Sequence, residues 1–231
     1  MPLVSPPFRA LVIGSSGTIG AAFLELLESN PSCTAVYGIH RNCATPIDYE
    51  DLDSIEVAAH SLVEQGPFQL IINTIGSLHS EHWMPEKKLA DLHAEQLQML
   101  MQVNAIGPSL TIKHFSKLLD PAGSVMATLS AKVGSIEDNR LGGWYSYRAS
   151  KAALNMLIKT AAIEFGRTMP NTALVALHPG TVNSRLSKPF KGEQIGRPPA
   201  DAASDMLQVL LSLTKEDSGI FISYAGERLP W

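Results

Sequence analysis

The feature that most constrains this chain is a glycine-rich segment between a short apolar run and a helical pattern. The apolar run, residues 9–13, is typical of a buried strand, and apolar residues recur at helical spacing from residue 19 to residue 28. The first turn of such a helix offers unpaired N–H groups to a phosphate. An ordinary strand-to-helix turn needs one glycine, whereas three indicate a dinucleotide site. The residues expected to bind this dinucleotide are Gly14, Ser15, Ser16, Gly17, Thr18, Ile19 and Gly20.

The rest of the chain alternates between strand-like and helical segments. Further strands are expected at residues 34–40, 45–48, 68–73, 124–129, 173–177 and 220–224, and helices at 53–65, 145–165 and 200–213. Residues 86–120 carry two helical patterns with a break near Gly107-Pro108. This alternation predicts the α/β class: one Rossmann-like, doubly wound domain with a mostly parallel sheet of about seven strands and helices on both faces.

Composition excludes several classes of protein. The charged fraction of 17% and hydrophobic fraction of 45% are typical of a globular chain, and a net charge of −4 disfavours nucleic acid or an anionic membrane as partner. The two cysteines, Cys33 and Cys43, do not suggest a disulfide framework. The start lacks a signal-peptide pattern, and no run is apolar enough for a membrane span. We expect a cytoplasmic protein with one domain over residues 1–231, of which residues 1–7 form an N-terminal tail.

The residues after the second expected strand bear on the choice of dinucleotide. A carboxylate at this place would bind the ribose 2′-hydroxyl of NAD and repel a 2′-phosphate. The chain has His40-Arg41-Asn42 instead, and the Arg41 guanidinium suits a phosphate. This favours NADP(H), with NAD(H) still possible, because Arg41 is otherwise an ordinary solvated loop charge.

Tyr147 and Lys151 lie four residues apart at the start of the longest helical pattern. Side chains at this spacing share one face of a helix. At about 4 Å and an effective dielectric constant of about 20, a unit charge is worth roughly 4 kcal/mol, or about three pKa units. The pair therefore predicts a phenol whose pKa is lowered enough to make it a proton donor near neutral pH.

Several segments together carry a resemblance to a known family. They are the glycine loop, Leu129-Ser130-Ala131-Lys132-Val133-Gly134-Ser135-Ile136, Trp144 to Lys151, His178-Pro179-Gly180-Thr181-Val182 and Leu229-Pro230-Trp231. Over nearly its whole length the chain resembles the short-chain dehydrogenase/reductase family, and more narrowly its C-factor-like members. The departures are Ile13, where threonine is usual, and Thr18, where the second glycine of the loop usually stands.

The resemblance implies a set of catalytic residues. Ser130 would hold the substrate carbonyl, Tyr147 would donate the proton, and Lys151 would lower the Tyr147 pKa and hold the nicotinamide ribose. Asn104 would support a helix kink and a proton-relay water. The nearby Ser135 is a weaker candidate for the role of Ser130. Tyr145 does not compete with Tyr147, because the residue four places after Tyr145 is Ala149.

The resemblance also implies further cofactor contacts. Asn73 and Gly76 lie in Asn73-Thr74-Ile75-Gly76, where the family usually has Asn-Asn-Ala-Gly, so a role beside the adenosine ribose is expected. Asp48 would contact the adenine amino group. The turn after the sixth expected strand would face the nicotinamide through Pro179, Gly180, Val182 and Ser184.

The function implied is an NADP(H)-dependent oxidoreductase that interconverts a carbonyl and an alcohol, and residues 184–199 would cover this small-molecule substrate. The alternative is a non-catalytic dinucleotide-binding sensor or signalling protein, which would need none of the four catalytic residues. His79, His82 and His93 lack a cysteine partner and a firm helical spacing, so no metal site is expected. The apolar face of residues 95–103 indicates core or subunit interface, and we expect a homodimer or homotetramer.

Overall fold

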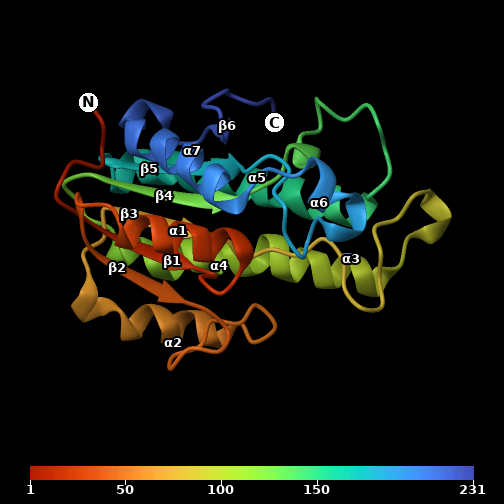
Figure 1. Cartoon of the computed structure of the whole chain (residues 1–231), viewed down its shortest axis with the longest axis horizontal. Coiled ribbons are helices and arrows are strands. Elements are labelled where there is room, and N and C mark those ends of the chain that lie inside the picture. The colour runs from red at the N-terminus through yellow and green to blue at the C-terminus, as the bar shows by residue number, and fades with distance from the viewer.

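Six parallel strands form the centre of the fold, in the order β2-β1-β3-β4-β5-β6 (Figure 1). This computed structural model describes residues 1–231. The strands are β1 (Phe8–Ile13), β2 (Cys33–Ile39), β3 (Leu70–Asn73), β4 (Ser124–Leu129), β5 (Thr172–His178) and β6 (Phe221–Ser223). The predicted α/β class and parallel sheet are confirmed, but the number of strands is six rather than seven.

The missing strand is the one expected at residues 45–48. There the backbone N–H groups find local partners: Asp48 N–H donates to Ser54 Oγ at 2.8 Å, and Ile47 N–H donates to the His40 carbonyl at 3.4 Å. Backbone groups that are satisfied in this way are not available for a ladder with β2. As a result, β2 is an edge strand, and the segment after it is free to line a cavity.

Seven α-helices accompany the sheet: α1 (Thr18–Glu28), α2 (Asp53–Ser61), α3 (Ala94–Met101), α4 (Gly107–Phe115), α5 (Tyr145–Thr168), α6 (Gly192–Ile195) and α7 (Pro199–Ser212). One apolar cluster packs α2, α4 and α5 against one face of the sheet, and a second packs α1 and α7 against the other (Figure 1). The prediction of helices on both faces is therefore confirmed. None of the helices combines the length and apolar composition needed to cross a membrane.

The helical region after residue 86 differs from the prediction in two ways. Residues 86–93 form a loop with a single 3₁₀ turn, Leu89–Asp91, before α3 begins. The expected break near Gly107-Pro108 is a change of helix type rather than an interruption: α4 begins at Gly107, with Pro108 in its first turn, where a proline loses no intrahelical hydrogen bond. A π-helical segment, Gln102–Ile106, joins α3 to α4. Such π segments often mark functional sites, and this one carries Asn104.

Two further chain segments differ in extent from expectation. Helix α5 continues past Gly166 to Thr168, because an α-helix tolerates an interior glycine at a cost of only about 1 kcal/mol. The segment expected to form a tail at residues 1–7 contacts the domain: Val4 is buried, and Leu3 N–H donates to the Leu213 carbonyl at 2.9 Å.

Candidate active site

A polar cavity of about 390 Å³ lies at the carboxyl ends of β1, β2 and β3. In a parallel sheet this edge is where the strand order reverses and where ligands bind. Six of the residues expected to bind the dinucleotide line it: Gly14, Ser16, Gly17, Arg41, Asp48 and Gly76. Tyr49, Thr74 and Arg185 complete much of the remaining wall, and sequence reasoning assigned none of these three to the site.

The glycine loop forms a cradle whose backbone is accessible. Helix α1 begins after Gly17 without a side-chain cap, so its first N–H groups are free to bind a phosphate. A Cβ on Gly20 would lie 2.8 Å from Thr74 Oγ1, and the Thr74 hydroxyl donates to the Ile13 carbonyl at 2.9 Å. Thr74 thus ties the end of β3 to the loop, and a dinucleotide fits this cradle.

Not all loop residues face the cavity. Ser15 is buried, and its hydroxyl donates to the Ile39 carbonyl at 3.3 Å. Thr18 and Gly20 line neither this cavity nor its neighbour, while Ile19 lines the neighbouring one. Ser15 and Gly20 therefore support the loop from behind, whereas Ser16 and Gly17 face the polar cavity.

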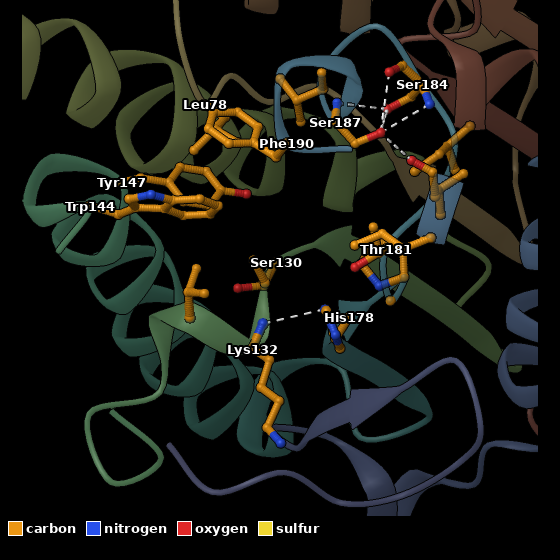
Figure 2. Close-up of a pocket in the computed structure, with 18 residues that line it drawn as sticks. Leu78, Ser130, Lys132, Trp144, Tyr147, His178, Thr181, Ser184, Ser187 and Phe190 are labelled. Atoms are coloured by element: carbon orange, nitrogen blue, oxygen red, sulfur yellow. Dashed lines mark hydrogen bonds between the residues drawn. The ribbon is translucent and has the colours of Figure 1, made fainter. Parts of the chain in front are cut away.

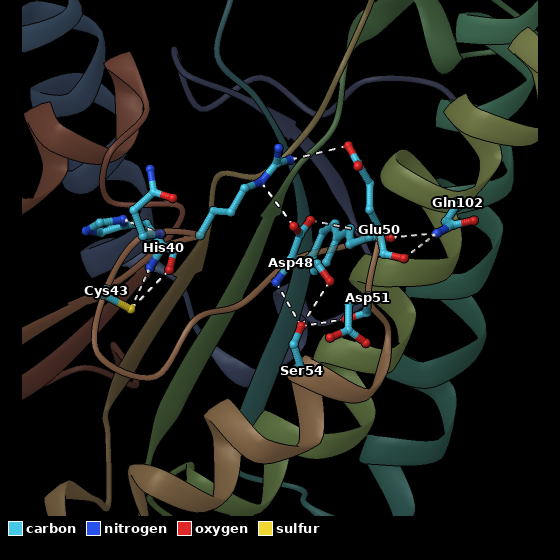
Figure 3. A network of polar contacts seen from close by, with 10 residues as sticks. His40, Cys43, Asp48, Glu50, Asp51, Ser54 and Gln102 are labelled. Carbon is cyan, nitrogen blue, oxygen red and sulfur yellow. Dashed lines mark hydrogen bonds and ion pairs between the residues drawn. The ribbon is translucent and has the colours of Figure 1, made fainter.

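Arg41 is held by two carboxylates at the far end of the cavity (Figure 3). Its Nε lies 3.3 Å from Asp48 Oδ2, and its Nη2 lies 3.6 Å from Glu50 Oε1. The arginine side chain is 62% exposed, so the two ion pairs are partly screened by solvent. Asn73 turns away from this region, because its Nδ2 donates to the buried Tyr49 hydroxyl at 2.8 Å.

A second cavity, of about 290 Å³, is lined in part by the same chain segments as the first. Gly17 and Arg185 line the polar cavity, and their near neighbours Ile19 and Leu186 line this one. Its wall is mostly apolar and aromatic, with Leu78, Val133, Trp144, Leu186, Phe190 and Ile195. Ser130 and Tyr147 point into the same open space (Figure 2).

The turn after β5 forms the opposite wall of this second cavity. Pro179, Gly180, Val182 and Ser184 all line it, as the comparison of motifs anticipated. The segment that follows contains α6, and backbone hydrogen bonds join its two ends. Asn183 N–H donates to the Arg197 carbonyl, and Arg197 N–H donates to the Thr181 carbonyl, both at 2.9 Å. Between these contacts the segment contributes Ser187 and Phe190 to the cavity.

The four expected catalytic residues converge from three elements. Ser130 follows β4, Tyr147 and Lys151 share one face of α5, and Asn104 lies in the π segment. Lys151 Nζ donates to the Leu129 carbonyl at 2.9 Å and lies 5.9 Å from the centre of the Tyr147 ring. Asn104 is fully buried, and its amide pairs with the backbone of Ser77 in both directions, at 2.7 and 2.8 Å.

Burial determines the pKa values of the tyrosine–lysine pair. It raises the pKa of Tyr147 above its ordinary value and lowers the pKa of Lys151 to about 7. The predicted lowering of the tyrosine pKa by a lysine at about 4 Å is therefore wrong for this geometry. Tyr147 instead holds its proton firmly, and Lys151 is a buried amine that titrates near neutrality.

His178 is a half-buried titratable group that lines the second cavity. Burial, with a smaller contribution from the charge of Lys132, lowers its pKa to about 4. Its Nδ1 accepts a hydrogen bond from the Lys132 backbone N–H at 3.3 Å, so the neutral ring carries its proton on Nε2. The sequence placed His178 in a motif without giving it a role.

Glu86 is a buried carboxylate that sequence reasoning did not select. Its oxygens accept the backbone N–H and the hydroxyl of Ser146, and its carbonyl accepts the Trp144 N–H at 2.5 Å. Helix α5 has no cap of its own, and Trp144 precedes it with a φ of +53°, a left-handed conformation that costs about 1–2 kcal/mol. Glu86 thus caps α5 from another segment and fixes the corner that presents Trp144 to the substrate cavity.

The histidines weighed as metal ligands have other contacts. The His79 ring lies 6.0 Å from that of Phe190, and its Nε2 lies 3.2 Å from the Leu186 carbonyl oxygen. The His93 ring packs on Trp83 at 4.5 Å. His79 therefore contacts two residues that line the second cavity.

Comparison with known proteins identifies the family. Residues 29–208 match a family model described as enoyl-(acyl carrier protein) reductase. The chain belongs to the short-chain dehydrogenase/reductase family, and it is an NAD(P)-dependent oxidoreductase of that family. It is 31% identical over 187 residues to the 1-hydroxy-2-glutathionyl-2-methyl-3-butene dehydrogenase of Rhodococcus sp. (strain AD45), covering 80% of this chain and 78% of that protein.

A second relative supports the resemblance to C-factor-like members. The chain is 32% identical over 167 residues to the C-signal protein of Myxococcus xanthus, covering 72% of this chain and 94% of that one. Among solved structures, the NADPH-bound carbonyl reductase from chicken fatty liver superposes with a TM-score of 0.84 at 23% identity, covering 100% of this chain and 96% of that chain. Such an identity shows a shared fold.

Proposed function

We propose that this short-chain dehydrogenase/reductase interconverts a small-molecule carbonyl and its alcohol with NADP(H), using Tyr147 as the general acid and base. The observation that carries the proposal is the position of the two hydroxyl groups. Ser130 and Tyr147 face one apolar cavity, and the glycine loop and the segment after Ser184 each contribute residues both to it and to the polar cavity. A carbonyl oxygen between the two hydroxyls would lie beside the nicotinamide of a cofactor bound across the two cavities.

Each residue has a distinct role in this scheme. The cofactor, when bound, supplies the hydride. Ser130 donates a hydrogen bond to the carbonyl oxygen. Tyr147 delivers a proton to that oxygen as it gains alkoxide character, because an alkoxide is a stronger base than a phenolate even where burial raises the tyrosine pKa. Lys151 holds the nicotinamide ribose and adds positive charge near the phenol. The wall of apolar side chains excludes water, which strengthens these polar interactions.

Asn104 and Gly76 would support the return of the proton to Tyr147. A Cβ on Gly76 would lie 3.3 Å from both Asn104 Oδ1 and Lys151 Nζ. The missing side chain therefore leaves a space between two polar atoms that suits a bridging water. A water there would connect the buried lysine to the polar cavity.

The preference for NADP(H) rests on Arg41. It lies at the end of the polar cavity that receives the adenosine, and several similar folds, including the chicken carbonyl reductase, are solved with NADP or NADPH bound. We expect Arg41→Ala to weaken NADPH binding about 10-fold and NADH binding little, measured by fluorescence titration. Equal activity of the wild type with both cofactors at low concentration would contradict the preference.

The substitution Tyr147→Phe tests the reaction itself. It removes the hydroxyl and keeps the ring, so we expect turnover to fall about 10³-fold or more with the NADPH dissociation constant unchanged. The assay is NADPH oxidation over a panel of aldehydes, quinones, diketones and keto acids. Substantial turnover by Tyr147→Phe would refute the assignment of the proton donor.

A dinucleotide-binding signalling protein is the second candidate, favoured by the similarity to the C-signal protein. It predicts cofactor binding without turnover on any substrate of the panel.

For either function, we propose one cytoplasmic domain over residues 1–231 that assembles as a homodimer or homotetramer. Exposed apolar side chains on α5, namely Met156, Leu157 and Ile163, support an assembly surface.

A further inference from the structure

Asn155 on α5 has an unsatisfied polar atom next to the proposed catalytic centre. Its Oδ1 accepts the Ser130 hydroxyl at 2.6 Å, and both side chains are 3% exposed. Its Nδ2 is buried and has no hydrogen-bond partner. Buried polar groups are almost always paired, so an orphaned amide nitrogen requires an explanation.

The present hydrogen bond points the Ser130 proton the wrong way for catalysis. In the proposed reaction Ser130 must donate this proton to the substrate oxygen. An oxygen acceptor at 2.6 Å competes directly with the substrate for it. A hydroxyl both donates and accepts, so Ser130 can bond equally to the other end of the same amide.

Turning the amide resolves both problems together. With Nδ2 toward Ser130, the orphaned N–H groups gain an acceptor, and the serine proton becomes free for the carbonyl. A cavity of about 160 Å³, lined by Gly134, Ile136, Met156 and Trp231, borders Asn155 away from Ser130. The oxygen and nitrogen ends of an amide are nearly the same size, so the turned amide fills the same space and does not displace the helix.

We propose that Asn155 is a positioning residue that sets the direction of the Ser130 hydroxyl proton by the orientation of its amide. In one orientation the proton is directed to Asn155 Oδ1. In the other, Asn155 Nδ2 donates to Ser130 Oγ, and Ser130 donates to the substrate carbonyl oxygen. No covalent bond is formed or broken in this step, and no electron is transferred. The proposal rests on the proposed function.

The decisive variant is Asn155→Asp. A carboxylate only accepts hydrogen bonds, so it holds the serine proton permanently away from the substrate. We expect kcat to fall about 100-fold or more at pH 8, similar to the loss of one oxyanion-hole donor. As the pH falls and the introduced carboxyl becomes protonated, it gains a donor, and activity recovers toward that of the wild type. A purely structural residue would not produce this inverted pH profile.

Two comparisons separate this effect from general damage. Asn155→Ala removes both acceptor and donor, and we expect a loss of about 10-fold with no change in the shape of the pH profile. Asn139→Asp adds the same charge to an exposed loop, where Oδ1 accepts the Gly142 N–H at 3.1 Å, and should leave activity unchanged. The NADPH dissociation constant, measured by fluorescence, should stay the same in all three variants.

A Ser130→Ala background completes the test. The proposal expects Asn155→Asp and Asn155→Ala to cause no further loss of kcat there, because no hydroxyl remains to be oriented. Equal losses in both backgrounds, or a wild-type pH profile for Asn155→Asp, would overturn the proposal. If Asn155→Asp does not fold, Asn155→Ala in the two backgrounds decides. The proposed function is tested separately, by measuring turnover by the wild type and the loss of turnover in Tyr147→Phe.

Discussion

The two cavities of the site are built in different ways. Most residues of the polar cavity lie in three short segments that follow β1, β2 and β3, and Val103 and Arg185 join them from elsewhere in the chain. The apolar cavity gathers Leu78, Trp144 and Phe190 from segments far apart in the sequence. Sequence motifs predict much of the first cavity, because each short segment after a strand contributes to it by itself. The second has motifs for Ser130, Tyr147 and the Pro179-Gly180 turn but none for its apolar wall, since the shape of that wall depends on how separate segments pack.

This difference implies that substitutions should separate the two halves. A change in the polar cavity should alter cofactor affinity, and a change in the apolar wall should alter substrate KM alone. Lys151 lies between the halves and should affect both. The following variants test this division, beginning with the largest expected effect.

Gly20→Ala should disable the polar half. The new Cβ would lie 2.8 Å from both the Gly14 carbonyl carbon and Thr74 Oγ1, so the loop must shift. We expect NADPH affinity to fall at least about 100-fold in a fluorescence titration, since phosphate contacts depend on backbone position. Gly166→Ala is the control: no heavy atom lies within 4 Å of its Cβ, and alanine should stabilise α5 by about 1 kcal/mol. Normal NADPH binding by Gly20→Ala would contradict the proposal that the glycine loop binds the cofactor phosphates.

Lys151→Met should stabilise the ligand-free protein while abolishing turnover. The pKa of Lys151 falls from 10.5 to about 7 on folding, so between these values the unfolded chain holds a proton that the folded protein lacks. Stability therefore rises with pH across this window, and the cost of the buried amine is fully present below pH 7. At pH 6 we expect a gain of about 2 kcal/mol, after allowing for the unpaired Leu129 carbonyl.

Urea unfolding at pH 6 and pH 9 measures this effect. The gain from Lys151→Met should shrink as the pH rises, whereas a gain independent of pH would mean that burial does not control this amine. Lys159→Met provides the matched control on the same helix. That side chain is exposed, and its Nζ donates to the Gly219 carbonyl at 3.1 Å, so no pH-dependent gain is expected.

Phe190→Ala should affect the apolar half alone. The Phe190 ring packs on Trp144 with centroids 5.0 Å apart, and its loss opens the wall of the substrate cavity. For an aromatic carbonyl we expect KM to rise about 10-fold while NADPH affinity stays within about 2-fold. Phe190→Leu, which keeps most of the apolar surface, should show a smaller rise. A parallel loss of cofactor affinity would show that the two halves are not independent.

Glu50→Gln should produce the smallest change, within the polar half. The Glu50 carboxylate lies 3.6 Å from Arg41 Nη2 and competes for it with a cofactor phosphate. Because both groups are exposed, we expect NADPH to bind only about 2- to 3-fold more tightly, with no change for NADH. Glu64→Gln, an exposed carboxylate outside either cavity, should leave both affinities unchanged. Equal gains for the two cofactors would argue against a 2′-phosphate at Arg41.

The site shows the same division in what could be predicted. The glycine loop, the Tyr147–Lys151 face and the Pro179-Gly180 turn were visible in the sequence, because each lies within one turn or helix. Asn155 was not, although it lies one turn after Lys151 on the same helix. Its importance appears only when β4 brings Ser130 to within 2.6 Å.

The pKa values separate sequence from tertiary structure most clearly. The spacing of Tyr147 and Lys151 determined that the two side chains share a helical face, since that depends only on helical geometry. Whether charge or burial controls their pKa values depends on the surroundings, and in the folded chain both groups are buried, Tyr147 against Leu78 and Leu100. The sequence by itself thus determined the parallel α/β fold, the family and the proposed reacting groups. Tertiary structure decided the number of strands, the protonation of the pair and the shape of the substrate cavity, because these depend on long-range packing.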